Sequence, residues 1–399
     1  MLRTTGICLS LLYDYMLSNN NEINENDILK AKNDKLKSLI SVFNKYGGVL
    51  SKIAQIVSTD NENMNVFDDC KAYSQDETVN YLKNYYNTNN NYITNISFVD
   101  FEIFKAGSVG QVHKCVDVNN NKLILKVQYD GLYKQFEDDI YMLDKIASYL
   151  FNFINFYDSL IYIKQKLFEE LDYKLEIKNH KMLYDLWSSC DDIKIPLIRD
   201  ELCDDKIICM EFIDGESLRE FLLNSTQNQK NMIGYKIVKF IFTNLFKHNI
   251  FYSDIHYGNF IIKDKKILYI TDFGCVHLMD IELIQKLKKI YKCIKTNNKN
   301  EFINVIKDLE IIKKDITEDS ENYMFEYFKL QYEPWINPDF HFNNKWLEKS
   351  VSKKPELMSE WNLPCNLVYL NKICYGLYHI LTKLNVHYNF TNLFEELNE

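Results

Sequence analysis

Apolar positions in the first part of the chain follow a helical period. Residues three and four apart form two apolar stripes: Leu36, Leu39, Ile40 and Phe43, then Leu50, Ile53 and Val57. Because this spacing returns to one face of a helix, we predict helical structure over residues 27–59, broken at Gly47-Gly48.

The pattern changes after a polar linker at residues 87–91. Short runs rich in β-branched and aromatic residues then alternate with turn residues, which predicts strands. The predicted strands are residues 97–105, 110–118, 122–128, 206–212, 260–263 and 267–271. Asn119-Asn120-Asn121 stands between two of these strands as a hairpin tip, and Asp264-Lys265-Lys266 stands between two others.

Helical periodicity returns over residues 134–185 and 229–250, and it dominates the chain after residue 271. The predicted order is helices, then a small sheet with helices, then a larger helical lobe that contains a hairpin. This arrangement predicts the α+β class.

Composition narrows the class of protein. A chain of 399 residues exceeds what one core usually holds, so we expect two or three packed units. The 46% of hydrophobic residues excludes wholesale disorder. Only 11 Gly and 5 Pro are present, which excludes collagen-like, linker-rich and turn-dense all-β chains.

Charge and cysteine usage further limit the class of protein. The net charge of −9 argues against bulk nucleic-acid binding but leaves room for a local pocket that takes one nucleotide. None of the 10 Cys forms a C-x-x-C pair, which predicts reduced cysteines in a cytosolic-type compartment. We expect neither a signal peptide nor a transmembrane helix, and therefore a cytoplasmic location or one peripheral to a membrane.

The sharpest chemical signal is Asp254, followed by Asn259 and then by Asp272-Phe273-Gly274. This order is typical of kinase catalytic and metal-binding loops. Asp254 would orient a nucleophile or accept its proton. Asn259 and Asp272 would hold Mg²⁺, which prefers hard oxygen ligands. The alternative is a surface turn beside a chance tripeptide, and the predicted hairpin between the two loops disfavours it.

A second signal is Lys126, which interrupts the apolar run Leu123–Val127. A Lys in an apolar strand is costly unless it is paired or bound to an anion. In kinases such a Lys binds the α- and β-phosphates and pairs with a helix Glu. The alternative is an edge-strand Lys that points to water.

The partner of Lys126 is expected in the acidic segment 169–176. On a helix, Asp172, Glu176 and Asn179 share one face, whereas Glu170 faces elsewhere. An ordinary solvated acidic face is the plainer interpretation.

A short loop precedes Lys126 where a nucleotide-covering loop belongs. It consists of Lys105, Ala106, Gly107, Ser108, Val109 and Gly110. With two Gly only, the loop by itself indicates no more than a hairpin turn.

Six ordered motifs together resemble those of the UbiB/ADCK/AarF family of atypical protein-kinase-like proteins. The family's K-x-G-Q, S-I-G-Q-V-H, V-A-V-K-V-Q, E-L-D-Y-x-x-E-A-x-N, M-E-F-x-x-G and H-A-D-P-H-P-G-N motifs are similar to residues 52–55, 105–113, 123–128, 170–179, 210–215 and 252–259. The resemblance covers the chain from about residue 40 onwards. No A-P-E element follows Gly274, as expected for this family.

The resemblance implies a two-lobed protein-kinase-like fold with a helical N-terminal extension. Residues 1–96 would be the extension, 97–213 the N-lobe with inserted helices, and 214–399 the C-lobe with a helical tail.

It also implies the roles of individual residues. ATP would lie against the loop at residues 105–110, Met210 and Phe212, with Lys126 oriented by Glu176. Other residues would regulate the site from the extension, namely Lys52 and Gln55, held by Glu170 and Asp172.

The implied activity is a Mg²⁺-dependent ATPase or phosphotransferase that acts on a small or lipid-like acceptor of isoprenoid or quinone chemistry. Expected partners are the nucleotide, a lipid or quinone-like molecule and a membrane surface in peripheral contact, with no nucleic acid. No protein partner is indicated. The alternatives are a small-molecule phosphotransferase of the aminoglycoside- or choline-kinase type and a nucleotide-sensing scaffold without turnover.

The chain departs from the family's motifs at several positions. Five are the departures closest to the expected site: Ala54 for Gly, Gly107 for one alanine of the family's alanine-rich nucleotide loop, Tyr252 for His, and Ile255 and Tyr257 for Pro; other motif positions, such as Ile177 for Ala, also differ. None of these changes removes an expected phosphate or metal ligand, which argues against a pseudokinase.

Overall fold

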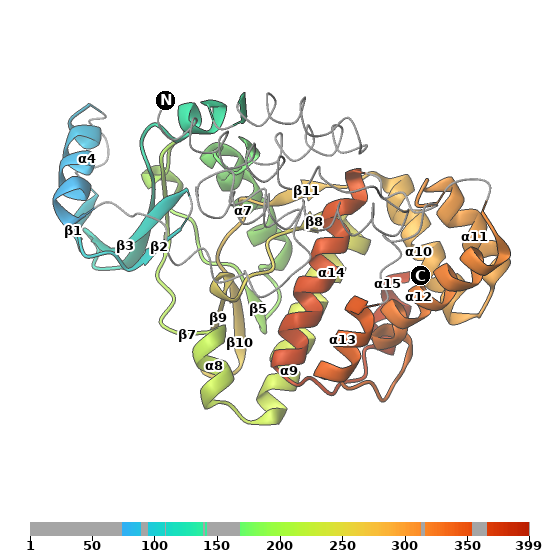
Figure 1. The fold of residues 1–399 in the computed structure, drawn as a ribbon. Helices are drawn as coiled ribbons and strands as arrows, with labels where there is room; N and C mark the ends of the chain where they lie inside the picture. Colours follow the sequence, from blue (N-terminus) through green and yellow to red (C-terminus); the bar gives the residue numbers. More distant parts are fainter. Residues whose placement is uncertain are drawn as a thin grey trace, which may run out of the picture. The chain divides into compact units, whose positions relative to one another are not determined.

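The computed structural model describes residues 74–88, 95–107, 109–138, 140–141, 168–312, 316–352 and 365–398 (Figure 1). The chain divides into two compact units. The first contains Met1–Leu175 and Ile198–Phe212, and the second contains Glu176–Leu197 and Ile213–Glu399. The helices predicted over residues 27–59 lie outside the described residues.

An antiparallel sheet of order β1-β3-β4-β6, with β2 paired to β3, forms the centre of the first unit. The strands are β1 (Ile96–Val99), β2 (Lys105–Ala106), β3 (Gly110–Asp117), β4 (Lys122–Gln128) and β6 (Ile207–Glu211). The same unit contains the helix α4 (Gln75–Thr88) and the short 3-10 helix η2 (Asp200–Leu202). The strands predicted at residues 110–118, 122–128 and 206–212 are confirmed to within a residue at each end.

The single strand predicted over residues 97–105 is wrong, because two short strands, β1 and β2, occupy this region. The Asp100 side chain accepts a hydrogen bond from the backbone N–H of Glu102 at 3.0 Å and turns the chain between them.

The hairpin predicted at Asn119-Asn120-Asn121 is confirmed. The Asp117 carboxylate accepts backbone hydrogen bonds from Asn119 at 2.9 Å and Asn121 at 2.7 Å. Asn120 adopts a φ of 66°, a left-handed conformation that Asn tolerates better than most residues.

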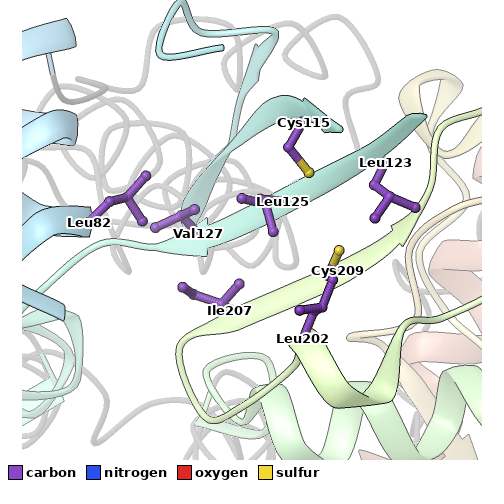
Figure 2. Packing of buried hydrophobic residues seen from close by; sticks show 8 residues of the cluster. All are labelled: Leu82, Cys115, Leu123, Leu125, Val127, Leu202, Ile207 and Cys209. Atoms are coloured by element: carbon purple, nitrogen blue, oxygen red, sulfur yellow. The ribbon is translucent and has the colours of Figure 1, made fainter. Parts of the chain in front are cut away.

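The core of the first unit lies on one face of this sheet, because side chains alternate along each strand. Figure 2 shows its buried cluster: Leu82 from α4, Cys115 from β3, Leu123, Leu125 and Val127 from β4, and Leu202, Ile207 and Cys209. The even-numbered residues of β4 therefore lie on the opposite face.

Buried polar side chains also link α4 to the sheet. Gln111 Nε2 donates to Thr78 Oγ1 at 2.7 Å, and Thr78 Oγ1 donates to the backbone oxygen of Ser74 at 2.9 Å. Gln111 Nε2 also lies 2.9 Å from His113 Nε2, and His113 Nδ1 lies 3.0 Å from the Asp100 oxygen. A backbone oxygen only accepts, so Nδ1 carries the proton and Nε2 accepts from Gln111.

The second unit has two small sheets and a set of helices. One sheet has the order β5-β10-β9-β7 and the other pairs β11 with β8. The strands are β5 (Ile193–Lys194), β7 (Glu216–Ser217), β8 (Ile250–Tyr252), β9 (Phe260–Lys263), β10 (Ile267–Ile270) and β11 (Val276–Leu278). The helices are α7 (Tyr173–Trp187, whose first residues belong to the first unit), α8 (Leu218–Asn224), α9 (Gln227–His248), η3 (Tyr257–Asn259), α10 (Ile281–Lys295), α11 (Lys299–Asp308), α12 (Glu318–Ile336), α13 (Asn344–Ser352), α14 (Cys365–Lys383) and α15 (Thr391–Asn398).

The buried helix predicted over residues 229–250 is confirmed as α9, with Thr226 and Gln229 forming its capping box. Lys236 lies on its buried face. Its ammonium donates to the Lys266 backbone oxygen at 2.6 Å and to Asp192 at 3.2 Å. Lys236 therefore ties α9 to the turn of the predicted hairpin, which the structure confirms as β9 and β10.

Within the described residues, no helix is long and apolar enough to cross a membrane. The cysteines that the structure describes are all free, as predicted for reduced thiols.

We predict that the stability of the first unit falls with acid through His113. Burial lowers the pKa of His113 below 6.5, so the unfolded chain binds this proton more readily than the folded chain. Stability is therefore complete above pH 6.5 and falls as the pH drops below it. Urea unfolding across this range measures the slope, which His113→Gln should reduce. An unchanged slope in the variant would contradict the prediction.

Candidate functional site

Lys126 lies on the face of the first unit's sheet that is opposite to the core. β4 runs between β3 and β6, so the alternative of an edge-strand Lys is wrong. Val112 and Ile208 are its register partners on the two neighbouring strands. Its Nζ lies 5.3 Å from the centroid of the Tyr173 ring. The Lys126 side chain is half-buried.

The same face continues to the end of β6, where Met210 pairs with Ile124 and Phe212 follows the strand. Lys114 Nζ lies 4.4 Å from the Phe104 ring centroid and 5.3 Å from that of Phe212. Cation and ring contacts of this length are favourable. Met210 and Phe212, predicted to contact the nucleotide, therefore share the Lys126 face.

The predicted nucleotide-covering loop joins β2 to β3. Gly107 N–H donates to the Gly110 oxygen at 2.8 Å, which closes a tight turn. A Cβ built on Gly110 would stand 2.4 Å from the Val127 oxygen and 2.7 Å from the Tyr173 hydroxyl. Only Gly fits at this position. Lys105, Ala106 and Val109 are described with it, whereas Ser108 lies outside the described residues.

The acidic segment before α7 differs from the prediction. The Asp172 carboxylate accepts a hydrogen bond from the Leu175 N–H at 3.0 Å, so Asp172 stands before the helix and caps it. The expectation that Asp172 and Glu176 share a helix face is therefore wrong. Glu170 lies in the preceding turn, and Glu176 lies buried in the first turn of the helix.

In the second unit, the structure brings Asp254 and Asn259 together. Asn259 Nδ2 donates to Asp254 Oδ2 at 2.6 Å and to the Asp254 backbone oxygen at 3.1 Å. Because both partners are acceptors, the amide must present its nitrogen to them. Asn259 Oδ1 takes no part in these two bonds.

Backbone hydrogen bonds join the loop that carries Asp254 and Asn259 to the Asp272-Phe273-Gly274 loop at both ends. Ser253 N–H donates to the Cys275 oxygen at 2.8 Å, and Thr271 N–H donates to the Asn259 oxygen at 3.1 Å. The β8–β11 ladder adds a register in which Tyr252 faces Val276. Asp254, Asn259 and Asp272 are thus held in one region of the second unit.

Helix α7 holds the second loop from the other side. Asn179 Nδ2 donates to the Phe273 oxygen at 3.3 Å, and the His180 ring lies 4.6 Å from the Phe273 ring. A Cβ built on Gly274 would lie 3.4 Å from Glu176 Oε2 and 3.5 Å from Asp272 Oδ1. Two carboxylates therefore flank Gly274.

The pKa of Tyr252 reflects its burial and the negative charge of the neighbouring Asp254 and Asp272. Burial raises the pKa of its phenol well above the usual value, and the nearby carboxylates of Asp254 and Asp272 raise it further. Both carboxylates therefore act on the same buried ring, which packs edge-on to Phe273 at 6.4 Å.

The donors present fit Mg²⁺ better than a transition metal. Among the described residues, no group of three or more His, Cys, Asp or Glu side chains is placed to hold a metal ion. The Asn259 amide oxygen and the Asp272 carboxylate are hard donors, and Mg²⁺ typically takes few protein ligands and keeps several waters. The predicted metal ligands thus agree with this ion in chemistry and in number.

The predicted site residues are divided between the two compact units. Lys126 and the loop at residues 105–110 belong to the first unit, and Glu176, Asp254, Asn259 and Asp272 to the second. Lys52 and Gln55 lie outside the described residues. Two positions were missed, Tyr173 and His180, and the signal for Tyr173 was its place in the E-L-D-Y motif.

This α+β fold and this order of motif residues are those of a kinase-like protein. The sequence profile of the ABC1 atypical kinase-like domain matches residues 65–306. The chain therefore belongs to the family of ABC1 atypical kinase-like proteins, which includes the UbiB and ADCK proteins.

Curated relatives and a solved structure are also similar to this chain. The chain is 23% identical over 312 residues to the mitochondrial atypical kinase coq-8 of Caenorhabditis elegans, covering 75% of this chain and 41% of that protein. It is 24% identical over 394 residues to the probable serine/threonine-protein kinase abkA of Dictyostelium discoideum. This match covers 88% of this chain and 68% of that protein. The solved structure of the Rv3197–erythromycin complex from Mycobacterium tuberculosis shares the fold, with a TM-score of 0.67 and 19% sequence identity. The match covers 94% of this chain and 98% of that chain.

We predict that Asn179→Ala loosens the Asp272-Phe273-Gly274 loop. The change leaves the buried Phe273 oxygen without its side-chain donor, which costs about 1–3 kcal/mol. Urea unfolding measures the loss, and amide hydrogen exchange over residues 271–276 should quicken. Lys178→Ala, on the exposed side of the same helix, is the matched control and should change neither. Equal effects of the two variants would contradict this role.

Proposed function

We propose that the protein binds Mg²⁺–ATP and either hydrolyses it or transfers its γ-phosphoryl group to a small or lipid-like acceptor. The observation that carries this proposal is the linked pair of loops in the second unit. Asn259 donates to Asp254 at 2.6 Å, and the backbone ties Asn259 to Thr271, directly before Asp272. Phosphoryl transfer needs such a fixed set of oxygen donors beside a carboxylate.

Each residue then has one role. Lys126 neutralises the α- and β-phosphates, and Glu176 orients Lys126. Asn259 and Asp272 supply the oxygen ligands for Mg²⁺, which when bound screens the phosphate charge. Asp254 orients the attacking hydroxyl or water and accepts its proton, and the hydrogen bond from Asn259 Nδ2 fixes the orientation of this carboxylate.

The family resemblance supports the acceptor class, because it implies isoprenoid or quinone chemistry. The coq-8 relative is named only as a mitochondrial atypical kinase. The chain spans less than half of that relative, so we propose only the acceptor's chemical class for this chain. Contact with a membrane would then be peripheral.

We predict that Asp272→Asn and Asp254→Asn separate binding from turnover. Loss of a metal ligand in Asp272→Asn should abolish the rise in melting temperature that Mg²⁺–ATP gives the wild type. Asp254→Asn should keep that rise but slow phosphate release by about 10²–10⁴-fold, because only the general base is lost.

Asp264→Asn is a matched control, because Asp264 lies exposed at a turn with φ 53°, which Asn tolerates. It should behave as wild type. If Mg²⁺–ATP shifts no melting temperature, the nucleotide proposal is wrong. If binding occurs without phosphate release, with or without phenolic or lipid additives, the nucleotide-sensing scaffold is the better description.

We further propose that Lys52 and Gln55 regulate the site, held by Glu170 and Asp172. The K-x-A-Q motif supports this proposal through the family resemblance. Lys52→Ala should change the selectivity between ATP and ADP or the rate of phosphate release, and Lys45→Ala in the same segment should not. If Lys52→Ala has no effect, an ordinary small-molecule phosphotransferase is favoured.

A further inference from the structure

Tyr173, the first residue of α7, contacts two elements that the proposed function assigns to the nucleotide phosphates. Its side chain is fully buried, with 0% of its surface exposed. Its ring faces Lys126, and its hydroxyl faces Gly110. All three residues belong to the first unit, so this arrangement is internal to one compact body.

The contact with Lys126 is electrostatic. Nζ of Lys126 lies 5.3 Å from the Tyr173 ring centroid, within the range in which an ammonium is attracted to the face of an aromatic ring. The attraction is stronger where water is excluded, and the ring here is fully buried while the Lys is half-buried. The ring therefore favours one position of a long, flexible side chain.

The contact with Gly110 is steric. The place of a Cβ on Gly110 is filled by the Tyr173 hydroxyl at 2.7 Å and by the Val127 oxygen at 2.4 Å. The backbone at the end of the nucleotide-covering loop is therefore pressed between β4 and the phenol. Backbone bonds also hold this end of the loop, since Gly110 pairs with Gln128 and the Tyr129 N–H donates to the Val109 oxygen at 3.1 Å. The phenol adds a side-chain contact to these bonds.

Tyr173 is itself anchored by its neighbours. Gln128 Nε2 donates to the Leu171 backbone oxygen at 2.8 Å, and Lys206 Nζ donates to Gln128 Oε1 at 2.6 Å. Gln128 is buried and ends β4, two residues after Lys126. The segment before α7 is thus bound to the same strand that carries Lys126.

We propose that Tyr173 is a positioning residue that fixes Lys126 and the Gly110 end of the nucleotide-covering loop relative to each other. The bond to β4 sets the place of the phenol, the ring holds the ammonium, and the hydroxyl holds the loop. The consequence for nucleotide binding rests on the proposed function, whereas the coupling between the residues does not.

A double-mutant cycle on the nucleotide-free full chain tests the coupling. Lys126→Met, Tyr173→Leu and the double variant are unfolded with urea and compared with wild type. We expect the two changes to be coupled by about three- to thirtyfold in the unfolding equilibrium constant. Additive effects would overturn the proposal.

Tyr129→Leu is the matched control, because Tyr129 is a buried Tyr of the same unit, next to the end of β4. Tyr129→Leu should not couple with Lys126→Met. Coupling as large as that of Tyr173→Leu would show a general loosening of the first unit and would overturn the proposal. Tyr173→Phe keeps the ring and removes only the hydroxyl. It should retain the coupling to Lys126 while amide exchange at residues 109–111 quickens. Unchanged exchange there would overturn the role at the loop, even if Tyr173→Leu does not fold.

A binding measurement separates this inference from the proposed function. Tyr173→Leu should weaken ATP binding about three- to thirtyfold and leave adenosine binding unchanged, because only the phosphates meet Lys126. Equal weakening of both ligands would overturn the positioning role. If the wild type binds no ATP, the proposed function fails, and the urea cycle still decides the role of Tyr173.

Discussion

The second unit depends on the hydrogen bonds that tie the Asp254 loop to the Asp272 loop. A carboxylate, an amide and a second carboxylate cannot converge by sequence spacing alone, because the hairpin β9–β10 separates them. The Ser253–Cys275 and Asn259–Thr271 backbone bonds close that hairpin at its base. Lys236 fixes its far end by bonding to Lys266. The hairpin is therefore held at both ends, and the site residues are placed by backbone geometry rather than by flexible side chains.

The first unit depends on a different constraint, the alternation of side chains along β4. Leu125 and Val127 fill the buried cluster with Leu82 of α4, and the same period places Lys126 on the other face. A shift of one residue in register would bury the ammonium in the core and expose the apolar side chains. The packing that stabilises the unit is thus the reason that Lys126 lies on the face opposite to the core.

Much of this could be predicted from the sequence, because the decisive signals are local. Strand bounds followed from short β-rich runs between turn residues. Lys126 was predicted as a site residue because it interrupts an apolar strand, and Asp254 was predicted from motif order. The start of α7 could not be predicted from periodicity, since the Asp172 side chain competes for a backbone N–H and begins the helix later. The contact of Thr78 with Gln111 joins residues that are distant in sequence, which no local pattern reveals. Tyr173 was missed because its contacts with Lys126 and Gly110 join residues that are distant in sequence.

The replacement of the family's His by Tyr252 has a physical consequence for the charge near the two carboxylates. An imidazole titrates near neutral pH and, when protonated, would place a cation beside Asp254 and Asp272. The Tyr252 phenol is buried, and its pKa is raised well above 10, so it stays neutral throughout the physiological range. Its ring packs against Phe240 at 5.4 Å and Phe273 at 6.4 Å, so it supports the second loop. Position 252 therefore carries no titratable cation, and the Asp254 and Asp272 carboxylates have a neutral aromatic neighbour there at physiological pH.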